Sequence, residues 1–514
     1  MESGNIVAES TMEGVSDQKP YKYLNLRTVA GGVFCVFLVL VLASGYIANI
    51  LTKESNETDS IYLACKQGDL AMFKRLAGDV VDLNLRDEHG LGPIHYACQE
   101  GRLVIVKALI ERGTDITVKT KLGLAPIHLA CKNGNVEVLD TLVKAIEDPT
   151  WIHVRTDNGS APIHLACRYG HVEVLNKLIE AGADIHAQTN AGVTPVHCAC
   201  QNGHVEVFNE LIKAGADINT VYTDGWAPIH LACWNGHVEM LNMLIEAGAD
   251  IHAQTNNGTA PIHCACWHGH VEVLNKLIKA GADINTADKD GWAPIHLACR
   301  NGHVEILNKL IEASANIHAQ KLDGSAPIHL ACWNGYVEVL NKLIKAGADI
   351  NTTDKDGWAP VHSACQNGHV EVLNKLIEAQ ANIHVQSNAG VAPIHLACLG
   401  GHVEVLIRLI KAGAGIKIVD NNGWAPVHSA CRNGHVDVLN KLIEAGANIH
   451  AQTHDGWAPI HLACWYGHVE VLNMLIEAGA DIIHKNINGQ APISLARKNG
   501  KQAIVDRLME LGER

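Results

Sequence analysis

The chain has 514 residues, of which 47% are hydrophobic and 18% are charged, as in ordinary globular proteins. Its 40 Lys and Arg against 54 Asp and Glu give a net charge of -14 that is spread along the chain, with no basic stripe. This balance argues against nucleic acid as a partner, because phosphate binding requires clustered Lys and Arg. Two counts are unusual, 31 His and an aromatic content of only 4% that nevertheless includes 10 Trp. Repetition explains both.

The N-terminal part differs from the rest. Residues 1–27 form a polar tail, and residues 28–52 contain no charged residue and centre on the run VFCVFLVLVLA. About 20 apolar residues are enough to cross a bilayer as a helix, so this segment is predicted to be a transmembrane signal anchor. The alternative is a cleaved signal peptide, because the most apolar stretch is short and is followed by the small residues Ser44 and Gly45.

A fixed period organises everything after residue 56. The Pro of the motif A-P-I-H-L-A-C serves as a marker, and it recurs with a period of 33 that is interrupted by a single interval of 36. A degenerate first copy has Ser60 in the marker position, so residues 57–514 comprise about 14 units. The marker prolines are Pro93, Pro126, Pro162, Pro195, Pro228, Pro261, Pro294, Pro327, Pro360, Pro393, Pro426, Pro459 and Pro492.

Each unit predicts two short helices. In residues 224–252 an Asp-Gly turn precedes Pro228, which suits the first helical position, and the helix should end at Gly236. A second helix with apolar residues at helical spacing should then run to Gly248. Neither helix can bury its apolar face alone, so the units are expected to stack into a solenoid.

The period of 33 and the sequence P-I-H-L-A-C-x-x-G-H-V-E-V-L-x-x-L-I-x-A-G-A-D-I closely resemble the ankyrin repeat family over residues 57–514. The resemblance implies an all-α solenoid of paired antiparallel helices with hairpin loops, and a function in protein–protein recognition. The chain departs from the family by having Ala before most marker prolines, where Thr usually caps the helix; a lost cap costs about 0.5 to 2 kcal/mol. In the 36-residue interval Pro149 replaces the usual A-G-A ending, so the stacking is expected to change there.

The Cys and His series are interpreted as structural. Thirteen of the 16 Cys lie five residues after the marker, where a small buried residue is expected. Twelve His lie two residues after it and nine follow the next Gly, which suits local hydrogen bonding at helix ends better than metal ligation. No metal, cofactor or small-molecule substrate is expected, and the chain has none of the sequence motifs of hydrolases, kinases or P-loop proteins, so no enzyme is predicted.

Nine of the ten Trp residues occupy two phases of the repeat that vary elsewhere in the chain. In proteins of the ankyrin type these phases resemble the positions that contact targets on the concave face, and exposed Trp is enriched at interface hot spots. They are therefore the predicted partner-binding residues; the alternative is that each ring packs on the neighbouring hairpin. Trp226, Trp292, Trp358, Trp424 and Trp457 lie two residues before the marker, and Trp234, Trp267, Trp333 and Trp465 lie six residues after it.

A longer period, twice that of the single repeat, is also visible, since Ile-His-Ala-Gln and Ile-Asn-Thr alternate in successive units. Recent pairwise duplication explains this pattern, and a ligand with a matching repeat is the alternative.

The function predicted from the sequence is a protein-binding scaffold tethered to a membrane through residues 28–52. Many unpaired Cys favour a cytosolic array, whereas glycosylation at Asn56, Asn158, Asn257 or Asn351 would place it outside the cytosol. A secreted or host-directed microbial protein and an accessory subunit of a membrane enzyme or channel are the alternatives.

Overall fold

The computed structural model describes residues 57–78, 82–146 and 148–512. These residues form 28 α-helices and one short 3₁₀-helix, and no strand occurs among them. The helices follow one another in pairs, which confirms the predicted all-α solenoid. In each pair we call the odd-numbered helix the first helix and the even-numbered helix the second helix. The chain divides into two compact units, which are described separately, and the boundary runs through the pair α11 (Pro195–Asn202) and α12 (Val205–Lys213).

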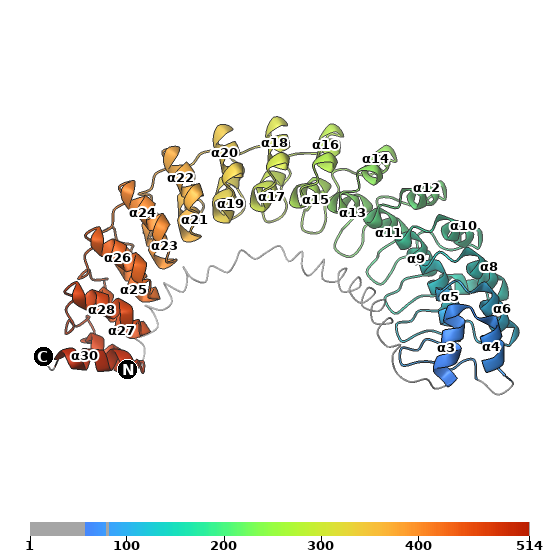
Figure 1. The fold of residues 1–514 in the computed structure, drawn as a ribbon. Coiled ribbons are helices and arrows are strands. Elements are labelled where there is room, and N and C mark those ends of the chain that lie inside the picture. Colours follow the sequence, from blue (N-terminus) through green and yellow to red (C-terminus); the bar gives the residue numbers. More distant parts are fainter. Residues whose placement is uncertain (1–56, 79–81, 147, 513–514) are drawn as a thin grey trace. The chain divides into compact units, whose positions relative to one another are not determined.

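The first unit contains the helices before that boundary (Figure 1, blue to teal). Its helices are α3 (Glu57–Gln67), α4 (Leu70–Leu76), α5 (Pro93–Gln99), α6 (Leu103–Glu111), α7 (Pro126–Lys132), α8 (Val136–Ala145), the 3₁₀-helix η1 (Pro149–His153), α9 (Pro162–Tyr169) and α10 (Val172–Glu180).

The second unit contains the helices after the boundary. Within it, the first helices form an inner row and the second helices an outer row (Figure 1). Its helices are α13 (Pro228–Asn235), α14 (Val238–Glu246), α15 (Pro261–His268), α16 (Val271–Lys279), α17 (Pro294–Asn301), α18 (Val304–Glu312), α19 (Pro327–Asn334), α20 (Val337–Lys345), α21 (Pro360–Gln366), α22 (Val370–Glu378), α23 (Pro393–Leu399), α24 (Val403–Lys411), α25 (Pro426–Asn433), α26 (Val436–Glu444), α27 (Pro459–Tyr466), α28 (Val469–Glu477), α29 (Pro492–Lys498) and α30 (Gln502–Gly512).

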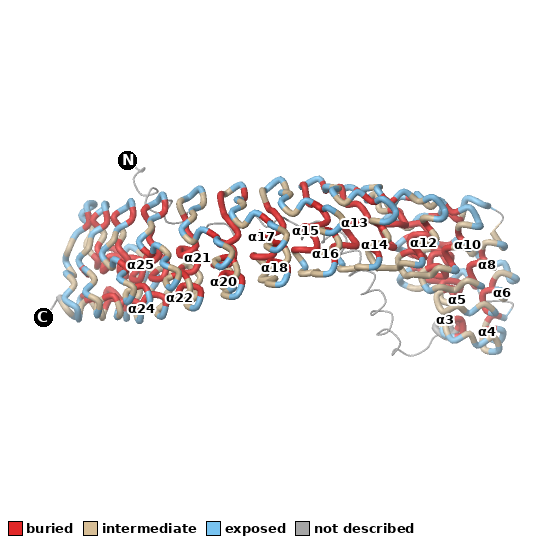
Figure 2. The backbone as a smooth tube through the Cα atoms, turned by 90° about the horizontal axis from the view of Figure 1, so that it is seen from above, coloured by how far each residue is buried: buried red, intermediate tan, exposed pale blue. Residues whose placement is uncertain are grey.

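The pair α13 and α14 shows why the sequence folds in this way. Pro228 stands at the first helical position, and Gly236 ends α13 in the left-handed conformation with φ of 76°. Met240, Leu241 and Leu244 form the buried stripe of α14. Adjacent first helices contact one another, as do adjacent second helices, so each pair buries its apolar face against its neighbours (Figure 2).

Within each unit, a buried imidazole joins most repeats to the following one. In His230, Nδ1 accepts a hydrogen bond from the backbone N–H of Ala227 at 3.1 Å, so the ring proton lies on Nε2. The Nε2–H group then donates to the carbonyl oxygen of Thr259 in the next repeat, at 3.0 Å. The His two residues after the marker makes this type of bridge in both units, for example from His128 to Ser160. The prediction that this His series forms local hydrogen bonds at helix starts is therefore confirmed.

In nine repeats a second imidazole follows the Gly after the first helix, and several of these rings contact the preceding repeat of the same unit. Nε2 of His270 contacts the carbonyl oxygen of Trp234 at 3.0 Å, at the end of the previous first helix. A Cβ on Gly236 would lie only 2.7 Å from this ring. Gly236 is therefore required both by its backbone conformation and by the space that the imidazole occupies.

The two-repeat period has a structural counterpart in the loops of the second unit. The side-chain oxygens of Asn219, Asn285 and Asn351 accept hydrogen bonds from backbone N–H groups 31 residues ahead, at 2.8 to 3.0 Å. At the alternate junctions the same position holds the exposed His252, His318 and His384. No equivalent side-chain bond to the next loop is found for these His in the described residues. From Asn219 to His384, repeats with and without this hydrogen bond to the next loop therefore alternate.

The 36-residue interval contains the only 3₁₀-helix of the described residues, η1. Asp148 caps it by accepting a hydrogen bond from the backbone N–H of Thr150 at 2.8 Å. A cavity of about 400 Å³ lies beside it, with Ile152 and Ile163 among its apolar lining and Arg155 and Asp184 among its charged lining. The extra residues thus replace the usual helix ending by a different turn.

The Cys series is buried throughout the described residues. All fifteen Cys there are free thiols with buried side chains. Burial raises the pKa of Cys65 and Cys464 to about 12, and it also raises the pKa of Cys98 and Cys131. These residues act as small apolar side chains between helices.

The predicted transmembrane segment, residues 28–52, lies outside the described residues. Among the residues that are described, no helix is long and apolar enough to span a bilayer.

Acidification should destabilise the array through the bridging imidazoles. Burial lowers the pKa of eight of these rings from 6.5 to about 4, namely His95, His128, His164, His230, His263, His296, His362 and His428. Between these two values the unfolded chain binds more protons than the folded chain, so stability rises with pH. The contribution of these neutral rings to the free energy of unfolding is complete above pH 6.5, and it is lost as the pH falls toward 4. Urea midpoints measured from pH 7 to pH 5 should therefore fall.

A matched pair of variants isolates this effect. Replacing His263, His296 and His362 by Asn should lower the midpoint at pH 7 and flatten its dependence on pH. The same replacement at the exposed His252, His318 and His384 should leave the slope unchanged. Equal slopes in all three proteins would contradict the role assigned to the buried rings.

Candidate protein-binding surface

The predicted Trp residues all lie in the second unit, but those before the marker are not exposed. Trp226, Trp292 and Trp358 are 6%, 9% and 8% exposed, and Trp424 and Trp457 are half-buried. The expectation of exposed rings is therefore wrong for the first three. Each of the five rings contacts the bridging imidazole of its own repeat, with centroids 5.4 to 6.2 Å apart.

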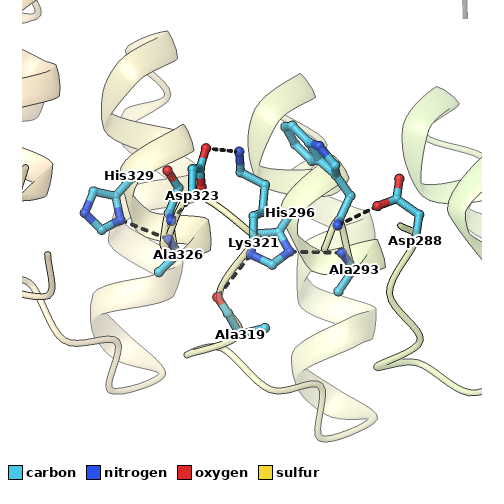
Figure 3. Close-up of polar contacts among 10 residues, drawn as sticks. Asp288, Ala293, His296, Ala319, Lys321, Asp323, Ala326 and His329 are labelled. Atoms are coloured by element: carbon cyan, nitrogen blue, oxygen red, sulfur yellow. Dashed lines mark hydrogen bonds and ion pairs between the residues drawn. The ribbon is translucent and has the colours of Figure 1, made fainter. Parts of the chain in front are cut away.

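The backbone of these Trp residues belongs to the hairpin. Trp292 N–H donates to Asp288 Oδ1 at 2.8 Å, and Trp292 O accepts from Nε2 of His263 in the previous repeat at 2.9 Å. Trp358 is held in the same way by Asp354 and His329. Burial raises the pKa of Asp288 to about 6, although the backbone N–H bonds to its carboxylate oppose this shift. Figure 3 shows Asp288 beside the bridge formed by His296.

The four Trp residues on the first helices are half-buried and more accessible. Trp234, Trp267, Trp333 and Trp465 lie near the ends of α13, α15, α19 and α27, on the inner row of the second unit (Figure 1). Where the same repeat also has Trp before the marker, the two rings meet edge to face. The centroids of Trp226 and Trp234 are 5.4 Å apart, and those of Trp457 and Trp465 are 5.5 Å apart.

Cations of the chain itself take the place of the helix Trp in other repeats. The guanidinium carbon of Arg300 lies 5.1 Å from the ring centroid of Trp292 and 5.3 Å from that of Trp267. Arg432 lies 6.0 Å from Trp424 and 5.7 Å from the ring of Tyr466. These distances are typical of cation–π contacts.

Lys321 is a buried cation in a hairpin turn where both neighbouring repeats have Asp. Its Nζ lies 4.3 Å from the ring centroid of Trp292 and 2.8 Å from Oδ2 of Asp323 (Figure 3). Burial lowers the pKa of Lys321, and the ion pair opposes this. Burial also opposes ionisation of Asp323, but its bonds from Lys321 and Ser325 outweigh that cost and lower its pKa. Trp292 is therefore contacted by two cations of its own chain.

The structure thus separates the predicted site residues into two groups. The four helix Trp residues, with Trp424 and Trp457, keep part of their surface accessible, whereas Trp226, Trp292 and Trp358 are hairpin core. Sequence reasoning did not single out Arg300, Lys321 or Arg432. The signal for the two Arg residues was that they occupy the position six residues after the marker, which holds Trp in four other repeats.

The other polar residues do not assemble a metal site in the described part of the chain. No group of three or more His, Cys, Asp or Glu side chains there could hold a metal ion.

The two groups of Trp residues should differ in what they contribute to stability. Truncating a buried Trp costs about 3 to 5 kcal/mol. Trp226→Ala, Trp292→Ala and Trp358→Ala should each shift the urea midpoint of the full chain far downward, because the rings fill the hairpin core. Trp267→Ala and Trp333→Ala serve as controls and should shift it much less. A similar loss in both groups would show that the helix Trp residues are structural as well.

Comparison with known proteins identifies the architecture. The profile described as ankyrin repeats (3 copies) matches residues 29–120, 115–189, 182–255, 262–354, 296–387, 328–422, 361–453, 394–486 and 440–514, and the profile of ankyrin repeats (many copies) matches residues 239–278. The chain is similar to the crystal structure of the human ASB11 ankyrin repeat domain, at 28% identity over 42% of this chain and 98% of that one, with a TM-score of 0.39. No curated protein matches. From these family matches, this chain belongs to the ankyrin repeat family.

Proposed function

We propose that this chain is a membrane-tethered scaffold that binds protein partners along the inner row of its second unit. The observation that carries the proposal is the row of half-buried Trp residues on the first helices, at Trp234, Trp267, Trp333 and Trp465. Large rings that remain partly accessible on rigid helices lose little conformational entropy on binding, and Trp is the residue most enriched at hot spots. The ankyrin repeat fold is typically an interaction module without catalysis, which agrees with this function.

The hairpin Trp residues have a supporting role in the proposal. Trp226 and Trp457 pack edge to face against Trp234 and Trp465 and so fix the orientation of these helix rings. Partners would contact the helix rings first, and the accessible parts of Trp424 and Trp457 would extend the same surface.

Removing the helix rings should abolish partner capture without unfolding the array. In the full chain, the combined changes Trp267→Ala, Trp333→Ala and Trp465→Ala should prevent co-purification of its protein partners, because each hot spot contributes about 2 kcal/mol or more. The thermal unfolding midpoint should change little. Capture and midpoint are measured on the same preparation.

Exposed apolar residues on loops provide the control. Ile483 and Val419 are 75% and 46% exposed, and replacing both by Ala should leave capture intact. Capture retained by the triple Trp variant would contradict the proposed surface. Capture lost from the loop variant as well would show that binding is not confined to it.

The membrane tether rests on residues 28–52, which contain no charge and are long enough to cross a bilayer. The full chain should therefore stay with the membrane pellet after alkaline carbonate extraction, and deletion of residues 28–52 should release it. The mass of the intact protein tests the alternative, since a signal peptide would leave a chain shortened near Ala43. Release of the full chain by carbonate would contradict an anchor.

The side of the membrane is a separate part of the proposal. A cytosolic array should carry no glycan at Asn158, Asn257 or Asn351, which lie in loops of the described array. Treatment with a glycosidase that shifts the mass of the chain would place the array outside the cytosol.

A further inference from the structure

The charges of the second unit are divided between its two rows of helices. Its first helices, α13 to α29, contain no Asp or Glu, and their only cations are Arg300, Arg432, Arg497 and Lys498. Every second helix from α14 to α30 contains at least one Asp or Glu. The inner row is therefore neutral to positive although the chain as a whole is negative.

The cations at the C-terminal end of this row are held on aromatic rings. Arg432 is half-buried and lies between Trp424 and Tyr466, at 6.0 and 5.7 Å from their centroids. Lys498 is exposed, with Nζ 5.7 Å from the centroid of Trp465. Within the described residues neither cation has an ion pair with a carboxylate. The rings fix the positions of both charges and leave the charges uncompensated.

We propose that the surface of Arg432, Trp457, Trp465, Tyr466 and Lys498 binds an extended acidic segment of a partner protein. The proposal rests on the function proposed above and names the chemistry of the partner for one end of that surface. Carboxylates of the segment pair with Arg432 and Lys498, and apolar side chains between them lie on the Trp rings. Guanidinium groups that are stacked on rings are well suited to pair with carboxylates through their edges.

The spacing of the two cations defines the segment further. Arg432 and Lys498 occupy the same phase two repeats apart, which is roughly 20 Å if neighbouring helices lie about 10 Å apart. An extended peptide spans about 3.3 to 3.6 Å per residue, so the two carboxylates should lie about six residues apart.

The small number of cations on this surface favours a polypeptide over nucleic acid. A nucleic-acid strand carries a phosphate on every nucleotide and requires a continuous basic stripe. Here the cations are few: Arg432 is the only one on its first helix, Lys498 has only Arg497 beside it, and the exposed Asp455 lies on the hairpin of the repeat between them. Such a surface offers few partners to a polyanion and suits a chain with a few well-placed acids.

Peptide selection on the full chain tests the proposal. Random twelve-residue peptides displayed on phage are selected against the immobilised protein, and the selected peptides are synthesised for affinity measurements. We expect enrichment of two Asp or Glu about six residues apart with apolar residues between them. Arg432→Gln combined with Lys498→Gln should weaken their binding about tenfold or more and reduce its dependence on salt.

A matched variant removes two charges from the outer row. Lys276→Gln with Lys342→Gln, on α16 and α20, should change affinity less than about twofold, because these residues lie on second helices. Unfolding midpoints of both double variants establish that the fold is intact. Competition with an oligothymidylate of similar length should be weak.

The outcomes separate this proposal from the one on which it rests. Selected peptides that are neutral or basic, or that bind the Arg432 and Lys498 variant normally, would overturn the acidic-segment assignment. If such peptides still lose binding to the triple Trp variant, the Trp surface stands. Acidic peptides that bind the triple Trp variant at full strength would contradict the Trp surface. Oligothymidylate binding as tightly as the peptides would overturn the choice of a polypeptide.

Discussion

The array depends on keeping one imidazole neutral and buried in twelve of its repeats. The ring must accept a backbone N–H at Nδ1 and donate from Nε2 to the next hairpin, and only the neutral tautomer can do both. This bridge partly offsets the absence of a capping side chain, since Ala227 and its counterparts have no side-chain hydrogen bond at the helix start. The bridge helps to hold the hairpins that accept it, because the acceptor is the hairpin backbone itself.

The Trp residues before the marker take part in the same bridge. The carbonyl oxygen of Trp292 accepts the imidazole bond from the previous repeat, while the indole ring packs against the imidazole of its own repeat. Trp292 therefore connects its hairpin both to the previous repeat and to the first helix of its own repeat. The rings of Trp234 and Trp465, six positions after the marker, pack instead on the hairpin Trp of their own repeat and stay half-buried. This difference explains why one set is core and the other forms a candidate contact surface.

Much of the fold could be predicted from the sequence, because the residues that begin and end the helices recur at the same positions from repeat to repeat. Pro228 and Gly236 mark the two ends of α13, and both ends lie where the pattern placed them. The burial of Trp226 could not be predicted in this way, since variation among repeats was interpreted as exposure. The position varies because the residue that covers it varies too, from Trp234 to Arg300 in different repeats. The residue two positions before the marker and the residue six positions after it vary together, and this relation can be recognised only when the contacts between them are known. The role of the nine Trp residues in binding remains a prediction.

The alternating Asn bonds between loops have a mechanical consequence. Asn219, Asn285 and Asn351 each accept a hydrogen bond from the following loop, and no such side-chain bond is found in the described residues for His252, His318 or His384, which hold the same position in the alternate repeats. Under tension along the chain, a linear array yields at its weakest interfaces first, because each repeat contacts only its neighbours. Between Asn219 and His384 the array should then lengthen in steps, each of which releases the chain of two repeats. An array pulled by a bound partner would extend over this range by the same increment each time.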